Sequence, residues 1–421
     1  MLSKSSFRTI RRSGDFVPST CLDWESFQLH TNDTVRNLVQ YLVAQSESLS
    51  HADLAKLETA LGFNYRKGGL LLHAKFGREI PEAVHFDWFH IYLVHGLAST
   101  EAGLLCGALV DCGFPSTRVD SFVESFKWPR QFAGSTPKKV FSDRDGRYDA
   151  AKCSASEMLN LLPVLRLFVL LFAWGHDVTD RAAYTSFLNL VAVIDMLVAI
   201  NRGKKVRPQE LKAAVLNHLR SFLARYQDES WVPKAHMAQH LHEFLTRHGT
   251  LISCFTHERK HRLVKRFASQ MVSPTNAFEK GLCQDILHVQ LGNLKELEVQ
   301  PRFQGVARLE DPKPAAGQVK ELGQQLFGNA LVHTSLVVNC GGLSIGKDDV
   351  VHCVIDGVVT VAKIWYHFQE RQRVLTCLCP WQHVHDHVYR VLDEPCIVDT
   401  SAINRLCVFS IKDGSGLVVP V

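Results

Sequence analysis

Apolar residues recur at helical spacing through the middle of the chain. Ser154, followed three residues later by Glu157, is typical of the start of a helix, and an apolar run over 161–174 follows it. A second apolar run spans 187–200. Pro208 predicts the start of a further helix with one apolar stripe: Leu211, Val215, Leu219, Phe222 and Tyr226. The same spacing predicts three more helices, over 233–246, 250–271 and 276–297.

The first 80 residues are predicted as a helical lead-in. Ser50 and Asp53 are typical of a helix start, and Gly62 offers a stop at its C-terminal end. An apolar and aromatic stretch follows over 84–97, and residues 98–132 are predicted as helix and turn.

The hydrophobic period changes to two beyond a Pro- and Gly-rich linker over 299–332. Two apolar stretches, 350–355 and 358–366, flank Asp356 and Gly357, which together predict a β-hairpin. Further short strands are expected over 374–378, 388–392, 406–411 and 417–421. The fold class is therefore predicted as α+β, with a mainly helical body followed by a small antiparallel, barrel-like β module over 333–421.

The composition is that of an ordinary globular protein. The chain has 421 residues, of which 46% are hydrophobic and 21% charged, and this argues against a largely disordered chain or a fibre. Its two apolar runs are shorter than the ~20 residues that cross a bilayer, and Arg166 and Asp195 interrupt them, so we expect no membrane-spanning segment. The 12 cysteines have no framework spacing and fit reduced thiols in an intracellular compartment.

Positive charge is concentrated in one segment. The formal net charge is +5, but residues 201–271 hold 14 Lys/Arg and 5 Asp/Glu, a net +9, which leaves −4 for the remainder. An excess of this kind favours a polyanionic partner for the segment.

Glu258 lies within this basic segment, surrounded by cationic residues: His257, Arg259, Lys260, His261, Arg262, Lys265 and Arg266. One interpretation is a solvated helix face on which Glu258 pairs with Arg262, four residues later. The other is a carboxylate that binds a divalent cation next to a phosphate-binding surface. Mg²⁺ prefers oxygen ligands, and the neighbouring cations would neutralise a nucleic-acid backbone.

Asp87 and His90 form a second polar pair, three residues apart among aromatic and apolar neighbours. One interpretation is a buried Asp–His hydrogen bond that holds two elements together. The other is that the pair forms part of an active-site wall.

Two further clusters invite comparison with zinc sites. His236 and His240 have the right spacing on a helix, but no adjacent Glu completes a His-Glu-x-x-His motif, which favours a structural or DNA-facing role. Cys377 and Cys379 precede a histidine-rich stretch over 383–387, but they lack the usual C-x₂-C spacing and fit thiols packed inside the β module.

Four motifs occur in an order that resembles a known family. They are Asp87-x-x-His90, Ala155-Ser156-Glu157-Met158-Leu159-Asn160-Leu161-Leu162-Pro163-Val164-Leu165, Pro233-Lys234-x-His236 and Phe255-Thr256-His257-Glu258. Over roughly residues 50–290 the chain resembles the C-terminal half of transposases of CACTA (En/Spm-like) DNA transposons. Its β-rich end resembles the module that often follows in that family.

This resemblance implies an RNase H-like DDE/D core, partial in this chain, that cuts and joins DNA with Mg²⁺. It implies a body over 81–298 with a helical insertion over about 155–230. Glu258 matches the final catalytic acid, Asp87 would act with it as a catalytic residue and metal ligand, and His90 would support the site. The nucleic-acid contacts expected are Arg259, Lys260, Arg262, Lys265, Arg266 and Lys234.

The resemblance also implies a nuclear protein whose partner is DNA. Self-association, or a complementary transposase subunit, is the other kind of partner that it suggests, and no membrane is expected.

The chain departs from the family pattern upstream of Asp87. The family carries its first two catalytic aspartates there, on strands, whereas the 86 residues that precede Asp87 here are predicted as helix and loop. Two-metal chemistry needs about three or four converging oxygen ligands, which Glu258 and Asp87 alone do not supply.

We therefore expect an N-terminally truncated, transposon-derived DNA-binding protein without independent catalytic activity, which uses Mg²⁺ only if it is catalytically competent. The alternative is a non-catalytic scaffold or interaction protein whose C-terminal β module binds a partner.

Overall fold

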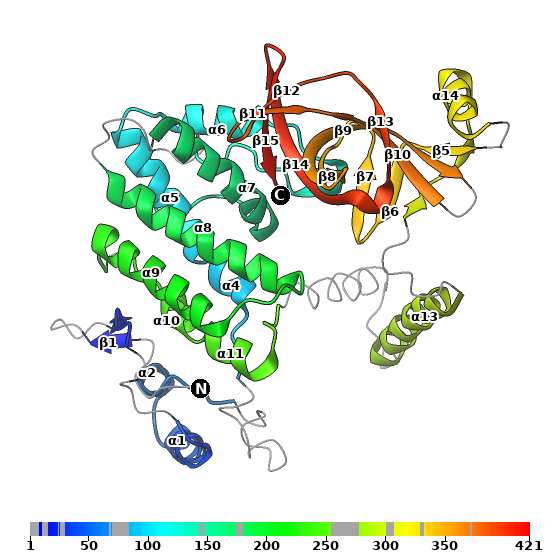
Figure 1. Ribbon diagram of the computed structural model, residues 1–421. Coiled ribbons are helices and arrows are strands. Elements are labelled where there is room, and N and C mark those ends of the chain that lie inside the picture. The colour runs from blue at the N-terminus through cyan, green and yellow to red at the C-terminus, as the bar shows by residue number, and fades with distance from the viewer. Residues whose placement is uncertain are drawn as a thin grey trace. The chain divides into compact units, whose positions relative to one another are not determined.

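The protein is α+β, as the hydrophobic pattern predicts: most helices precede residue 300, and most strands, which pair antiparallel, follow it (Figure 1). The computed structural model describes residues 8–10, 16–23, 25, 30–66, 69, 84–142, 146, 148–173, 180–228, 230–253, 278–299, 307–328, 332–370 and 373–421. The chain divides into two compact units. The first comprises Met1–Cys112, Arg147–Ala151 and Asp177–Cys254, and the second comprises Gly113–Gly146, Lys152–His176 and Phe255–Val421.

The first unit is mainly helical. Its helices are α1 (Asn32–Ser46), α2 (His51–Leu61), α4 (Trp88–Tyr92), α5 (Leu97–Asp111), α8 (Arg181–Asn201), α9 (Pro208–Tyr226), α10 (Lys234–Gln239) and α11 (Leu241–His248). Two short strands, β1 (Arg8–Ile10) and β2 (Phe16–Pro18), pair antiparallel. Helices α8 and α9 lie side by side along much of their length (Figure 1).

Several helix boundaries follow from local capping, as expected. Ser50 Oγ accepts the backbone N–H of Asp53 at 3.2 Å at the start of α2, and Gly62 ends that helix with a φ of +77°. Pro208 begins α9, and the predicted apolar stripe on it is buried except for Tyr226, which is partly exposed.

The single helix predicted over 233–246 is wrong, because the chain forms two helices that meet at His240. The backbone N–H of His240 bonds to the carbonyl oxygen of Met237 at 3.2 Å, three residues back rather than four. This tighter turn ends α10, and α11 starts immediately after it. The predicted helix over 250–271 lies outside the described residues except for 250–253, which are not helical.

Gly103 allows α5 to approach the segment 148–151 closely. A Cβ atom at Gly103 would lie 2.6 Å from the Cα of Ala150. Two hydrogen bonds hold the same contact: the Ala151 N–H donates to the Ser99 carbonyl at 2.8 Å, and Ser99 Oγ donates to the Ala151 carbonyl at 3.0 Å.

The second unit combines helices with an extensive antiparallel sheet. Its helices are α6 (Ser116–Glu124), the 3₁₀ helix η3 (Arg130–Ser135), α7 (Ala155–Phe168), the π-turn η5 (Val169–Ala173), α13 (Phe278–Val299), α14 (Gly317–Phe327) and the 3₁₀ turn η6 (Thr400–Ala402). Ser154 caps α7 as predicted, since its backbone N–H donates to Glu157 at 2.7 Å while its Oγ accepts the Glu157 N–H at 3.3 Å.

The strands of this unit extend from residue 308 to residue 420. They are β3 (Arg308–Leu309), β4 (Lys313–Pro314), β5 (His333–Ser335), β6 (Val337–Cys340), β7 (Leu343–Gly346), β8 (Val350–Ile355), β9 (Val358–Glu370), β10 (Arg373–Pro380), β11 (Gln382–His385), β12 (Val388–Arg390), β13 (Cys396–Asp399), β14 (Ile403–Lys412) and β15 (Ser415–Pro420). The predicted hairpin is β8–β9, and Asp356 and Gly357 form its turn with φ values of +49° and +80°. Strands β3, β6 and β7 form a separate small sheet.

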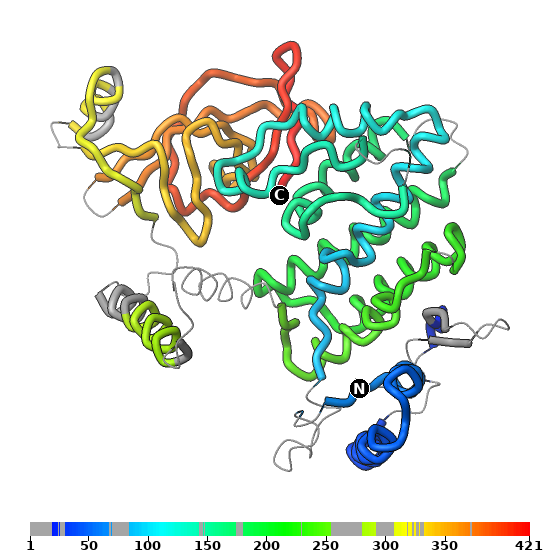
Figure 2. The backbone as a smooth tube through the Cα atoms, turned by 180° about the vertical axis from the view of Figure 1, so that it is seen from behind, coloured from blue at the N-terminus to red at the C-terminus, as the bar shows by residue number. Residues whose placement is uncertain are grey.

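The expected barrel is not found, because the main sheet is open. Its strand order is β11-β12-β15-β14-β8-β9-β10-β13, and no pairing joins β11 to β13 among the described strands. The long strand β9 pairs with β8 through residues 358–363 and with β5 through residues 367–369, both on the same edge. Strands β8 and β5 thus pair with different parts of the same edge of β9, so the sheet branches at β9 instead of closing into a barrel. Figure 2 shows these strands from behind.

Three helical stretches among the described residues are long and apolar enough to cross a membrane, judged by length and composition alone. They are Trp88–Asp111, Ala155–Ala173 and Arg181–Asn201, and 67%, 50% and 56% of their most apolar windows are buried within the protein. The expectation of no membrane-spanning segment stays a prediction.

Replacing Gly103 with alanine is expected to lower the free energy of unfolding by about 1–3 kcal/mol, because the added methyl group would collide with the backbone of Ala150 rather than with a flexible side chain. Urea unfolding measures this loss. Gly134→Ala is the matched control, since a Cβ there meets nothing within 4 Å. Equal unfolding midpoints for the two variants would contradict the close approach of α5.

Candidate functional site

Asp87 caps the short helix α4 and orients His90 within it. One carboxylate oxygen of Asp87 accepts the backbone N–H of Phe89 at 3.0 Å, and the other accepts a hydrogen bond from Nδ1 of His90. The Asp87 side chain is 11% exposed and that of His90 is 41% exposed. The intervening Trp88 and Phe89 are buried. The predicted Asp–His hydrogen bond therefore exists, but it lies within one helical turn instead of joining two elements.

Lys234 lies beside this helix although it is far from it in sequence. Its ammonium group donates to the carbonyl oxygens of Val94, at 2.5 Å, and His95, at 3.1 Å, in the turn that follows α4. Burial lowers the pKa of Lys234. Lys234 thus holds the turn between α4 and α5, and its predicted contact with DNA stays a prediction.

His236 and His240 form a buried pair near Lys234 in the sequence, with His236 in α10 and His240 at the end of that helix. Their Nε2 atoms lie 3.0 Å apart, and each side chain is 1% exposed. Burial, followed by the neighbouring His240, lowers the pKa of His236 to about 3. Nδ1 of His242 donates to the carbonyl oxygen of Gln239 at 2.8 Å. A neutral His236 can share one N–H with His240, which fits a structural role, one of the two roles (structural or DNA-facing) that the sequence favours over zinc.

A buried charge that we did not predict lies deeper in the same unit. Glu101, on α5, accepts a hydrogen bond from Ser186 Oγ of α8 at 2.5 Å, and its other oxygen lies 2.6 Å from Nε2 of His218 on α9. All three side chains are fully buried. The signal in the sequence is an acidic residue in the interior of a mostly apolar helix.

The geometry of this cluster differs from that of a hydrolase. Ser186 donates to the Glu101 carboxylate rather than to His218, so the serine–histidine hydrogen bond of a hydrolase triad is not formed between them, and all three side chains are closed off from solvent. Burial, and secondarily the charge of Glu101, raise the pKa of Tyr92 nearby. We interpret the cluster as a structural link between three helices.

Three of the nine Lys and Arg residues in the described part of the basic segment are paired with carboxylates of the protein. Arg207 pairs with Glu210 at the start of α9. Lys212 pairs with Glu25 at 2.6 Å, and Arg225 binds both oxygens of Asp180. The excess of positive charge along the sequence therefore overstates the charge that these residues offer to a partner.

The predicted centre around Glu258 lies outside the described residues. The same holds for its basic neighbours: Arg259, Lys260, Arg262, Lys265 and Arg266. Within the residues that the structure does describe, no group of three or more His, Cys, Asp or Glu side chains is placed to hold a metal ion. In the β module, Cys377 and Cys379 are buried, whereas His383 and His385 are exposed.

Comparison of the sequence with known protein families finds no matching family, and no curated protein matches the chain.

Replacing Glu101 with alanine is expected to lower the free energy of unfolding by about 3–5 kcal/mol, because Ser186 and His218 would lose their common buried partner. Glu101→Gln keeps one acceptor oxygen, so we expect it to cost about 1–3 kcal/mol. Urea unfolding measures both. Glu47→Ala, at an exposed position, serves as the control and is expected to stay within about 0.5 kcal/mol of wild type. Wild-type stability of Glu101→Ala would contradict the buried link.

The depressed pKa of His236 predicts a loss of stability in acid. The folded state holds His236 neutral down to about pH 3, whereas the unfolded chain takes up the proton near pH 6.5. The stability that this group contributes is therefore present above pH 6.5 and is lost as the pH falls from there toward 3.

The measurement is the free energy of unfolding at pH 7.5, 6.0 and 5.0. His236→Gln is expected to reduce the acid slope by up to about 1 kcal/mol per pH unit. His51→Gln, at an exposed position, should leave the slope unchanged. The same slope in wild type and His236→Gln would show that His236 titrates normally in the folded state.

Proposed function

We propose that this chain is a transposon-derived DNA-binding protein, related to the rear part of a CACTA-type DDE/D transposase and without independent catalytic activity. The proposal includes a partial RNase H-like core with a helical insertion over about 155–230. It also includes a nuclear location.

The observation that supports this proposal best is the contact between two of the four motifs. The Asp87-x-x-His90 motif forms α4, and the Pro233-Lys234-x-His236 motif begins α10, which packs against α4. Lys234 then bonds to the turn that follows α4. Two sequences that match the family in order are thus parts of one local structure, as parts of one site would be.

The hydrogen bonds of Asp87 support the proposal that the chain binds DNA without cutting it. Its two carboxylate oxygens already accept hydrogen bonds within α4, from Phe89 and His90. Asp87 could offer Mg²⁺ one ligand together with Glu258, but two-metal strand cutting needs further oxygen ligands that converge on both ions. Mg²⁺ would therefore bind only in a catalytically competent assembly. A second copy, or a complementary transposase subunit, could complete such an assembly.

DNA binding by the Glu258 region gives the direct test. Replacing Arg259, Lys260 and Arg262 together with alanine is expected to weaken binding to double-stranded DNA. The slope of log K against log salt is negative, and each lost phosphate contact should make it less steep by about 0.9. For three lost contacts the slope should become less steep by up to about 2.7. Fluorescence anisotropy over a series of salt concentrations measures it. A matched control replaces three exposed lysines elsewhere: Lys138, Lys313 and Lys320.

Two outcomes would contradict the proposal. Absence of salt-dependent DNA binding by the wild-type chain would favour the scaffold or interaction protein instead. Robust cutting of transposon-end DNA with Mg²⁺ or Mn²⁺, abolished by Glu258→Gln, would show that the chain is catalytic after all.

A further inference from the structure

The turn between α8 and α9 presents a compact group of exposed cations. Arg202, Lys204 and Lys205 are all exposed, and no acidic residue occurs between Arg202 and Glu210. None of the three forms an ion pair with another described residue. We call these three residues the basic turn.

The backbone of the basic turn is held in one conformation. The N–H groups of Arg202, Gly203 and Lys204 donate to carbonyl oxygens in the last turn of α8 at 3.0, 2.9 and 2.9 Å. Gly203 adopts a φ of +76°, which ends the helix in the left-handed conformation that glycine favours. The three cations are thus displayed from a fixed backbone, so that less entropy is lost when they bind.

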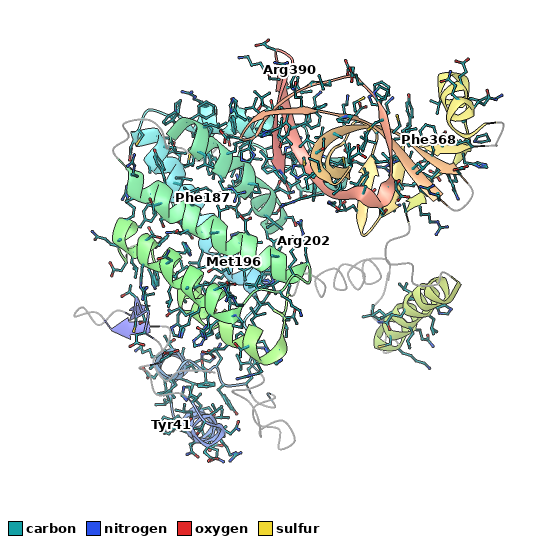
Figure 3. The ribbon with its side chains drawn as sticks, viewed as in Figure 1. Tyr41, Phe187, Met196, Arg202, Phe368 and Arg390 are labelled. Carbon is teal, nitrogen blue, oxygen red and sulfur yellow. The ribbon has the colours of Figure 1, made fainter. Side chains whose placement is uncertain are left out.

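The position of the turn makes it accessible. Helices α8 and α9, of 21 and 19 residues, pack side by side and form a helical hairpin about 30 Å long. The basic turn is the tip of this hairpin. Figure 3 shows Arg202 at the end of α8, beyond Phe187 and Met196 on the same helix.

The basic turn differs from four other described cations of the basic segment. Arg207, Lys212 and Arg225 are each neutralised by a carboxylate of the protein, and Lys234 bonds to backbone carbonyls. Intramolecular pairing accounts for those cations, but not for the basic turn. Exposed arginine and lysine side chains that pair with no described carboxylate, on a turn whose backbone is hydrogen-bonded, are suited to a polyanion with closely spaced charges.

We infer that the basic turn contacts the DNA phosphate backbone and forms a second binding surface in addition to the Glu258 region. This inference rests on the proposed function. Lysine and arginine contacts of this kind carry no base information, so the turn would contribute affinity and orientation without sequence specificity.

The test is the salt dependence of DNA binding by the full chain with Arg202, Lys204 and Lys205 replaced together by alanine. The negative slope of log K against log salt is expected to become less steep by roughly 2–3. The affinity at about 0.15 M salt should fall at least tenfold. Both changes should be the same on unrelated DNA sequences. The control variant replaces Lys138, Lys313 and Lys320, which are exposed and lie outside the basic segment. It should keep the wild-type slope. Thermal melting should be unchanged in both variants, since all six side chains are exposed.

The outcomes separate this inference from the proposed function. If the wild-type chain binds DNA and the basic-turn variant keeps its slope, the inference is wrong and the proposed function stands. If the wild-type chain does not bind DNA, both are wrong. If the basic-turn variant keeps the wild-type slope but fails to accumulate in the nucleus, the turn binds an acidic protein such as an import receptor. The inference that the turn contacts DNA phosphates is wrong in that case too.

Discussion

The carboxylate of Glu101 is buried between three helices of the first unit, and the packing of those helices depends on how it is satisfied. Ser186 from α8 and His218 from α9 each approach one of its oxygens. Removing a charge from water costs several kcal/mol even after relaxation, so the three helices must keep the positions that satisfy it. Helices that meet through apolar side chains alone could shift past each other by one row of side chains. The helices α5, α8 and α9 can satisfy Glu101 in only one relative position.

The candidate site is built on that frame. Helix α4 immediately precedes α5, which carries Glu101, and the ring of Tyr92 at the end of α4 lies 6.3 Å from the ring of His218. Lys234 binds the turn between α4 and α5 and so connects α10 to the same frame. Asp87 and His90 are therefore held by the hydrogen bonds within α4, by the contact of Tyr92 with His218, and by Lys234 at the turn that follows α4.

The ion-pair partners of the Lys and Arg residues change the interpretation of the basic segment. The net +9 over 201–271 suggests one continuous basic surface. Within the described part, carboxylates and carbonyl groups occupy several of those cations, and the cations that remain unpaired include the three at the tip of the α8–α9 hairpin. Any attraction toward a polyanion would therefore act at discrete points, whose contributions can be separated by mutation.

The amino-acid sequence by itself determined the features that depend on neighbours along the chain. Ser154 and Glu157 form a capping box, Pro208 begins α9, and Asp356 with Gly357 forms the hairpin turn, because caps and tight turns are satisfied within a few residues. Only the tertiary structure decided what depends on distant partners. Glu101 meets Ser186 and His218 through three separate helices, and β9 shares one edge between β8 and β5 so that the sheet stays open. These outcomes were inaccessible to pattern analysis, because hydrophobic periodicity shows which face is buried but not which residue it is buried against.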